Sequence, residues 1–330
     1  MAHVVLGIGA SHTPLLTLES EQWMHRASAD YNNTHLNLSD GRWVSYAQLL
    51  QEVGPRHEAV VTAEILGRKA KACAAALEKL ADALEAANPD VVIIIGDDQA
   101  ELFSPSNQPV LALFHGDEIV TSDKFGDDDA PEWVRAMGRG YLMDEMHRVP
   151  GSQRFALELI EGLITRGIDV ASLAQVEDPR KAAFGHAYGF IIKRLFRGRQ
   201  IPVVPVLLNT YFPPNVPTAG RVHDMGLALA EAIEESPSRL RTAVIASGGL
   251  SHFVVDERLD QRILDAFIER DTATLRSIPR GALHSGSSEI LNWIMTAGAT
   301  TRLHLAWHEY HPLYRTPAGT GVGAAFAIWR

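Results

Sequence analysis

Three apolar runs of this chain end in glycine, and each is followed by side chains that bind metal ions or transfer protons. The runs are residues 4–9 followed by His12, residues 91–96 followed by Asp97, Asp98 and Gln99, and residues 243–249 followed by His252. Imidazole nitrogens and carboxylate oxygens are metal ligands, and histidine also acts as a general acid or base near neutral pH. If the fold brings these residues together, they form a polar site with metal-binding character.

The three runs have the features of buried β-strands. They are short, rich in β-branched residues and bounded by glycine, which is typical of strands that are covered on both faces of a parallel sheet. In open α/β sheets, ligands bind just beyond the carboxyl ends of such strands. We therefore expect His12, residues 97–99 and His252 to meet at one edge of a sheet.

A long amphipathic helix is predicted between the first two runs. Apolar residues repeat at alternating steps of four and three from Leu66 to Leu84, and Asn88-Pro89 ends the pattern. Two strands joined by a helix form a βαβ unit. This unit carries a large insertion, residues 19–56, whose tryptophans and tyrosines favour an ordered lid over a tail.

The expected fold is a single α/β domain spanning residues 1–330, with αβα layers, a central mostly parallel or mixed sheet, and the lid-like insertion after the first strand. Further strands are expected at residues 110–114 and 201–208, the latter at a sheet edge because it contains two prolines. Further helices are expected at 155–164, 227–233, 259–268 and from Ser285 onward, and a glycine loop at 319–323 precedes a final strand.

Composition excludes several classes of protein. The chain has 330 residues and a net charge of -10, which disfavours nucleic acids and anionic membranes as partners. Its single cysteine, Cys73, excludes an internal disulfide and a cysteine-rich zinc site. The apolar runs are shorter than the roughly 20 residues of a membrane span, and no basic stretch precedes an apolar run at the amino terminus. We therefore expect no signal peptide, no membrane contact and a cytoplasmic location.

Two more residues could complete the site. Glu289 lies in the first turn of a predicted helix, where a carboxylate either complements the helix dipole or binds a divalent cation. Two histidines and one carboxylate with open positions form the iron site of non-haem Fe(II) oxygenases. His186 follows Gly185 and either faces this site or is a solvated loop histidine.

Magnesium-dependent phosphate chemistry is an alternative use of the carboxylates. Asp97, Asp98 and Gln99 offer the oxygen ligands that Mg²⁺ prefers. The chain has no phosphate-binding motif of the Walker type, and the glycine loop near its end is followed by a strand instead of a helix. The sequence therefore gives little support to phosphate binding.

Taken together, these segments resemble the class III (LigB-type) extradiol ring-cleavage dioxygenases over nearly the whole chain. The resemblance rests on Gly-Ala-Ser-His12-Thr-Pro, residues 91–99, Phe-Gly-His186, residues 205–214, Ser-Gly-Gly-Leu-Ser-His252 and Gly-Ser-Ser-Glu289. It implies that His12 and Glu289 bind Fe(II), that His252 is the catalytic acid/base, and that His186 lines the substrate pocket. It also implies a homodimer that binds a catechol-type substrate and O2.

One position departs from the family pattern. The second iron histidine of the family follows an acidic residue at the end of the second strand, where this chain has Gln99. An amide oxygen is a weaker iron ligand than imidazole. Either Gln99 coordinates directly or through water, or another histidine fills the place. His57, just before the long predicted helix, is one candidate, and His35 in the insertion is a more distant one.

The Gly-Asp-Asp-Gln segment and the early aromatic insertion are similar to the branch that opens 3-O-methylgallate and lignin-derived biphenyl catechols. In such an enzyme His252 takes a phenolic proton from the substrate and later donates a proton as the ring opens. Asp98 and Tyr211 are the expected substrate-binding residues, together with His186. Two other functions stay open: a zinc- or magnesium-dependent hydrolase that uses His12, Asp97, Asp98 and His252, and a non-catalytic binding protein on the same fold.

Overall fold

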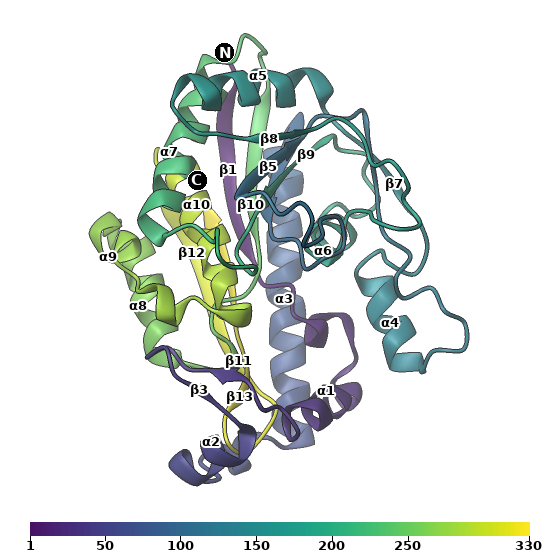
Figure 1. Ribbon diagram of the computed structural model, residues 1–330, viewed down its shortest axis with the longest axis vertical. Coiled ribbons are helices and arrows are strands. Elements are labelled where there is room, and N and C mark those ends of the chain that lie inside the picture. Colours follow the sequence, from purple (N-terminus) through teal and green to yellow (C-terminus); the bar gives the residue numbers. More distant parts are fainter.

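The computed structural model describes residues 1–330 and is built on a nine-stranded sheet (Figure 1). Along the sheet the strands are ordered β11-β13-β1-β10-β4-β9-β5-β8, and β12 pairs with β13. Its centre consists of four parallel strands, namely β1 (His3–Ala10), β10 (Arg241–Ser247), β4 (Val91–Gly96) and β9 (Val203–Leu208). The three predicted runs are therefore adjacent parallel strands, so their carboxyl ends lie at one edge.

The remaining strands make the sheet mixed. They are β5 (Leu111–Phe114), β8 (Ala171–Leu173), β11 (His252–Val254), β12 (Leu305–Tyr314) and β13 (Thr320–Trp329). Strand β13 is antiparallel to β1, β11 and β12, and β5 is antiparallel to β9. Two small antiparallel strand pairs lie outside the sheet: β2 (Leu36–Asn37) with β3 (Trp43–Val44), and β6 (Glu118–Val120) with β7 (Arg148–Pro150).

Helices cover both faces of the sheet. The helices are α1 (Trp23–Asp30), α2 (Tyr46–Val53), α3 (Ala63–Ala87), α4 (Glu132–Gly140), α5 (Gln153–Thr165), α6 (His186–Leu195), α7 (Ala219–Glu235), α8 (Glu257–Glu269), α9 (Thr272–Arg276) and α10 (Ile290–Ala299). Val92 and Ile94 of β4 belong to the core that contains α3 and α6, whereas Val91, Ile93 and Ile95 belong to the core that contains α5, α7, α8 and α10. This double burial explains the uninterrupted apolar runs and confirms the αβα layers.

Two expectations about strands were wrong. Strand β9 is not at an edge, because it lies between β4 and β5. Its Pro205 is tolerated there because the ladder to β5 ends at the pair of Leu113 and Val206, so that Pro205 itself is not paired with β5. The glycine stretch near the end of the chain is largely part of β13, and its partner β12 has no counterpart among the predicted strands.

The insertion, residues 19–56, forms α1, the β2–β3 hairpin and α2 at one end of the molecule (Figure 1). A small apolar cluster holds it together and includes Leu36, Tyr46 and Leu49, with Ala318 from the turn before β13. In addition, Asp30 at the end of α1 accepts two hydrogen bonds from Arg315, from Nε at 2.7 Å and from Nη2 at 3.1 Å. The insertion is thus packed on the strands that end near the predicted site.

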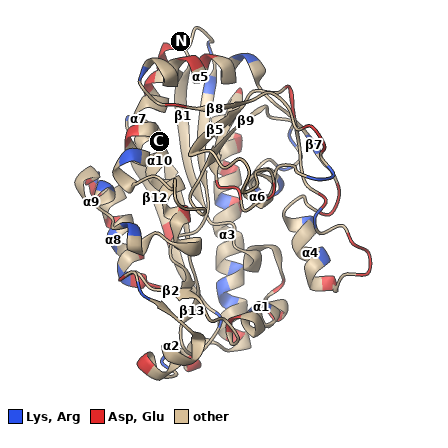
Figure 2. Cartoon of the chain, viewed as in Figure 1, with Lys and Arg blue, Asp and Glu red and all other residues tan.

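Positions of both acidic and basic residues are spread over the helices and loops around the sheet, as Figure 2 shows. No helix of the structure combines the length and the apolar character that crossing a membrane requires.

Candidate active site

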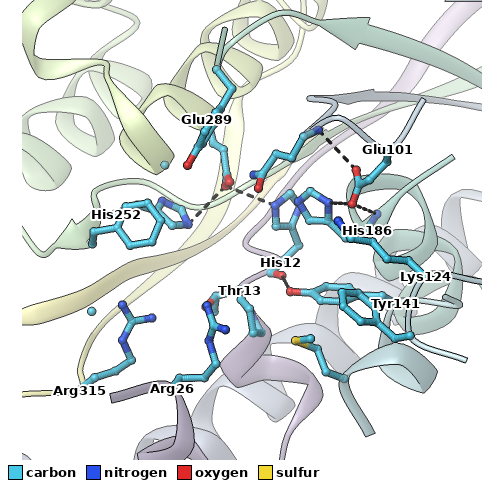
Figure 3. Close-up of a pocket in the computed structure, with 18 residues that line it drawn as sticks. His12, Thr13, Arg26, Glu101, Lys124, Tyr141, His186, His252, Glu289 and Arg315 are labelled. Atoms are coloured by element: carbon cyan, nitrogen blue, oxygen red, sulfur yellow. Dashed lines mark hydrogen bonds and ion pairs between the residues drawn. The ribbon is translucent and has the colours of Figure 1, made fainter. Parts of the chain in front are cut away.

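A cavity of about 320 Å³ lies beyond the carboxyl ends of the central strands. Among the residues that line it are His12 after β1, Gln99 after β4 and His252 after β10 (Figure 3). The parallel pairing of β1, β10 and β4 brings these three segments together, as the strand pattern predicts. His186 and Glu289 line the same cavity from the start of α6 and from the turn before α10.

Four side chains form a group that could hold a metal ion. One ligand atom from each of His12, Asp97, His186 and Glu289 lies within 4.8 Å of the corresponding atoms of the other three. Nε2 of His12 and Oδ1 of Asp97 are buried and have no hydrogen-bond partner. Buried polar atoms are rarely left unpaired, and nitrogen and oxygen donors without sulfur suit a divalent ion such as iron, manganese or zinc. The residues therefore fit a bound metal.

The hydrogen bonds of His12 fix which of its nitrogens is free. Its Nδ1 lies 2.8 Å from Oγ of Ser247, and that hydroxyl donates its own proton to the carbonyl of Ala187 at 2.6 Å. The hydroxyl is therefore an acceptor from His12, so Nδ1 carries the hydrogen. In the neutral ring this leaves the lone pair of Nε2 free, which is the arrangement of metal-binding histidines.

Glu289 connects the metal-binding group to His252. Its Oε2 lies 3.4 Å from Nε2 of both His12 and His252, and it accepts a hydrogen bond of 2.7 Å from the backbone N–H of Gly249. Burial raises the pKa of Glu289, but His252, His12 and the Gly249 N–H lower it to about 2. Glu289 is therefore a carboxylate at neutral pH, as a metal ligand must be.

His186 is held by a carboxylate that the sequence did not indicate. Its Nδ1 lies 2.7 Å from Oε1 of Glu101, and both side chains are buried. Glu101 raises the pKa of His186 against the effect of burial, and His186 correspondingly lowers the pKa of Glu101. A Cβ atom at Gly185 would lie 1.9 Å from the Glu101 carboxylate, so this close contact requires glycine there.

Asp97 and Gln99 are paired with each other. Nε2 of Gln99 donates to Oδ2 of Asp97 at 3.1 Å, which leaves Oδ1 facing the metal-binding group. Burial and, less strongly, the charge of Glu289 raise the pKa of Asp97. A cation bound between Asp97 and Glu289 would remove this repulsion. Gln99, which the sequence offers as a candidate iron ligand, lines the cavity, and its amide donates to Asp97.

His252 lies beside Glu289 but is not one of the four residues that could hold the metal ion. Its Nδ1 donates to the carbonyl of Leu250 at 2.9 Å, so Nε2 is the free acceptor in the neutral ring. Its backbone N–H donates to Oγ of Ser287 at 2.8 Å. Cβ atoms added at Gly249 and Gly286 would lie 2.5 Å and 2.4 Å from its side chain, so both glycines are needed for its position.

The structure does not bring His57 or His35 to the site. The ring of His57 stacks on that of Tyr314, with 3.8 Å between the ring centres, outside the cavity. His35 is exposed, and its side chain forms a hydrogen bond with that of Thr34. Helix α3 does start on the side of the sheet edge, but its 25 residues span about 37 Å, against about 20 Å for the six residues of β4. The amino-terminal end of α3 therefore extends beyond the sheet edge, and His57, which precedes it, lies away from the group of His12, Asp97, His186 and Glu289 (Figure 1).

Of the two expected substrate-binding residues, only Tyr211 lines the cavity. Asp98 instead holds the loop after β4, because its carboxylate accepts hydrogen bonds from the backbone N–H groups of Leu102 at 2.7 Å and Phe103 at 3.1 Å. Burial raises the pKa of Asp98 to about 6. The structure thus gives Asp98 a role in loop geometry.

Several lining residues were not expected from the sequence. Tyr141 donates a hydrogen bond of 2.7 Å to the carbonyl of His12 and comes from a segment without regular apolar spacing. The side chains of Arg26 and Arg315 lie across the cavity from Glu289, and Lys124 lies beside Glu101 (Figure 3). These cations come from the insertion and from loops, where side-chain direction cannot be inferred from periodicity.

Two comparisons with known proteins indicate the family of this chain. Residues 53–326 match the family described as the catalytic LigB subunit of aromatic ring-opening dioxygenase. A gallate dioxygenase from Pseudomonas putida is 30% identical over 132 residues, which are 37% of this chain and 38% of that protein. That alignment therefore spans less than half of either protein. The family match covers most of the chain and includes Asp97, His186, His252 and Glu289, whereas His12 precedes it. The chain belongs to the family of catalytic LigB subunits of aromatic ring-opening dioxygenases.

Proposed function

We propose that this protein is an Fe(II)-dependent extradiol dioxygenase that opens a single-ring catechol, such as gallate or 3-O-methylgallate, with O2. One observation carries the proposal: two histidines and two carboxylates converge around unpaired buried ligand atoms, directly beside a histidine with a free ring nitrogen. Family membership supplies the reaction class. The partial similarity to a gallate dioxygenase supports this substrate class.

We assign the iron to His12, His186 and Glu289, with Asp97 beside them. Both histidines are held at Nδ1 by an oxygen acceptor, Ser247 for His12 and Glu101 for His186. Such partners orient metal-binding histidines and raise their basicity. This set is two histidines and one carboxylate, the arrangement of non-haem Fe(II) oxygenases. His186 then takes the place of the second iron histidine, for which Gln99 and His57 were the sequence candidates.

When bound, Fe(II) would supply the redox chemistry by which a catechol and O2 react. His252 would then provide proton transfer. Its Nε2 is unprotonated in the neutral ring and lines the cavity, so it can accept the proton of a ring hydroxyl. The resulting imidazolium returns a proton to the oxygen anion that develops as the ring opens. Glu289, 3.4 Å from Nε2, stabilises the imidazolium between these two steps.

The cavity favours one aromatic ring over two. Its volume of about 320 Å³ is at the lower end of the range of roughly 300–1,000 Å³ for small-molecule sites. Phe253, Tyr141 and Tyr211 provide flat apolar surface around it. We therefore favour gallate-type substrates over biphenyl catechols within the branch that the sequence resembles.

Oxygen uptake tests the proposal. The protein is purified under nitrogen, loaded with Fe(II), and mixed with gallate, 3-O-methylgallate or pyrogallol in an oxygen electrode. We expect one O2 consumed for each ring opened, and no uptake by the zinc-loaded protein, because zinc has no redox chemistry. Absence of uptake with every catechol, together with ester or amide hydrolysis by the zinc form, would instead establish the metal-dependent hydrolase.

A further inference from the structure

Arg26 is a cation of the cavity wall whose side chain forms no ion pair and no hydrogen bond. Arg26 of α1 lines the cavity, its Nε is buried without a hydrogen-bond partner, and no carboxylate lies within ion-pair distance of its guanidinium. Figure 3 shows its side chain pointing across the cavity towards His12 and Glu289. A partly buried guanidinium without a counter-ion destabilises the folded protein, because its charge has lost part of its hydration and no ion pair compensates for that loss.

The neighbouring arginine differs in this respect. Arg315 also lines the cavity, but it makes a two-point ion pair with Asp30, which in addition accepts a hydrogen bond of 2.7 Å from Thr320. The carboxylate of Asp30 is therefore engaged by Arg315 and Thr320, and it makes no ion pair with Arg26. This wall of the cavity therefore has two guanidinium groups but one carboxylate, which is paired with Arg315, and the charge of Arg26 is left for a ligand.

The position of Arg26 is set by the helix that carries it. Trp23, Ala27 and Asp30 are the buried residues of α1, and they lie on one face at spacings of four and three. Arg26 is four residues before Asp30, one turn of the helix away. Its side chain therefore projects next to the buried face of α1. The helix is fixed at its end by Asp30, so the guanidinium is presented from a rigid element.

We propose that Arg26 is a specificity-determining residue that binds the anionic substituent of the substrate, a carboxylate on the aromatic ring. The inference rests on the proposed function, since it places the ring between His252 and Arg26. A planar guanidinium pairs with a carboxylate through two parallel hydrogen bonds, which orients the ring as well as binding it. The diol end then faces the metal-binding group on the opposite wall.

Lys124 is the competing cation. It lines the cavity too, but it is largely exposed and its charge already acts on Glu101, where it helps to lower the pKa of that carboxyl. A flexible exposed lysine gives weak and poorly oriented binding compared with a partly buried arginine. Lys124→Met is therefore the matched control for Arg26→Met.

The kinetic test compares gallate with its neutral methyl ester in the Fe(II)-loaded enzyme. In Arg26→Met we expect kcat/KM for gallate to fall about 10- to 100-fold through KM, the effect of losing a charge-assisted hydrogen bond, and methyl gallate to change less than about threefold. Arg26→Lys should restore part of the gallate activity. Equal losses for both substrates, or a selective loss in Lys124→Met instead, would overturn the proposal.

A binding test separates this inference from the proposed function. Calorimetry under nitrogen measures 4-hydroxybenzoate, which has no vicinal diol to cleave, and its neutral amide on wild-type, Arg26→Met and Arg26→Lys holoprotein. We expect the acid to bind more tightly than the amide only when residue 26 is cationic. If the wild-type protein cleaves no catechol, the function fails while this result still tests Arg26. Equal affinity of wild-type protein for acid and amide would overturn the role of Arg26.

Discussion

The Nδ1 atom of His186 lies 2.7 Å from the carboxylate of Glu101, inside the protein and directly behind the metal-binding group. This contact turns the other side of the imidazole towards His12, whose ring centre is 4.7 Å from that of His186. Metal-binding histidines are commonly oriented by a carboxylate in this way, and the contact therefore supports our proposal that His186 binds the iron. We therefore propose that His186, and not Gln99 at the end of β4, takes the place of the family's second iron histidine.

The first prediction concerns metal content. His186→Ala and His12→Ala should each lose Fe(II) after dialysis, because each removes an imidazole from the group. His57→Ala should retain one iron per chain, because its ring stacks on Tyr314 outside the cavity. Metal analysis by mass spectrometry measures all three. Full iron in His186→Ala together with loss of iron in Gln99→Ala would return the third ligand to Gln99.

The second prediction concerns Glu101 as an orienting residue. Glu101→Gln keeps the size of the side chain but removes its charge, so His186 becomes a weaker and less well oriented ligand. We expect the affinity for Fe(II) to fall about 10- to 100-fold, the usual cost of losing such a partner. Competition with a chelator under nitrogen measures it. Wild-type affinity in Glu101→Gln would show that the ion pair only stabilises the fold.

The third prediction is a pH dependence of the metal-free protein. Burial lowers the pKa of His186, but Glu101 raises it more, to about 9. A raised pKa in the folded state stabilises the protein fully below the unfolded value of about 6.5, and this stabilisation is lost as the pH rises through about 9. The urea concentration at the unfolding midpoint of the metal-free protein should therefore decrease as the pH rises from 6.5 to 9.5. The fall should be smaller in Glu101→Gln, and an identical fall in both proteins would contradict the prediction.

The fourth prediction separates proton transfer from metal binding. His252→Asn should bind Fe(II) like the wild type, because His252 is outside the four-residue group. Its kcat should fall about 10²- to 10⁴-fold, the usual contribution of a general acid or base. Iron content and oxygen uptake are measured on the same preparation. Turnover near the wild-type value would remove His252 from the mechanism.

The fifth prediction tests the room around His252. Gly286→Ala would place a Cβ 2.4 Å from Cβ of His252, so the ring must move and kcat should fall at unchanged iron content. We expect a destabilisation of about 1–3 kcal/mol from overpacking. Gly220→Ala is the control, since the nearest atom to its Cβ would lie 3.5 Å away. Urea unfolding measures the stability of both variants, and oxygen uptake measures their kcat. Equal stability and equal kcat in the two variants would contradict the prediction.

The edge of the sheet that carries the site could be predicted from the sequence. Runs of β-branched residues ending in glycine predict buried parallel strands, and such strands deliver His12, residues 97–99 and His252 to one edge whatever the details of packing. The same reasoning places the long helix correctly. It fails for His57, because the helix is longer than the strand beside it and periodicity carries no information on where a helix starts in space.

The partners of the site residues could not be predicted. Glu101 and His186 are 85 residues apart, and their contact depends on the path of a loop and on the missing side chain of Gly185. Arg26 reaches the cavity because an ion pair between Asp30 and Arg315 fixes its helix across 285 residues of sequence. Contacts of this kind come from tertiary packing, and no local pattern of residue types encodes them.

The ion pair of Asp30 and Arg315 has a consequence for how substrate enters. It fastens α1 to the chain between β12 and β13, and the apolar cluster of Leu36, Tyr46 and Leu49 fastens the rest of the insertion. The conformational entropy of these residues is therefore lost when the chain folds, and not when a ligand arrives. We therefore expect the cavity to be formed before a ligand arrives, and the rate of association to be set by diffusion into the cavity instead of by closure of the insertion.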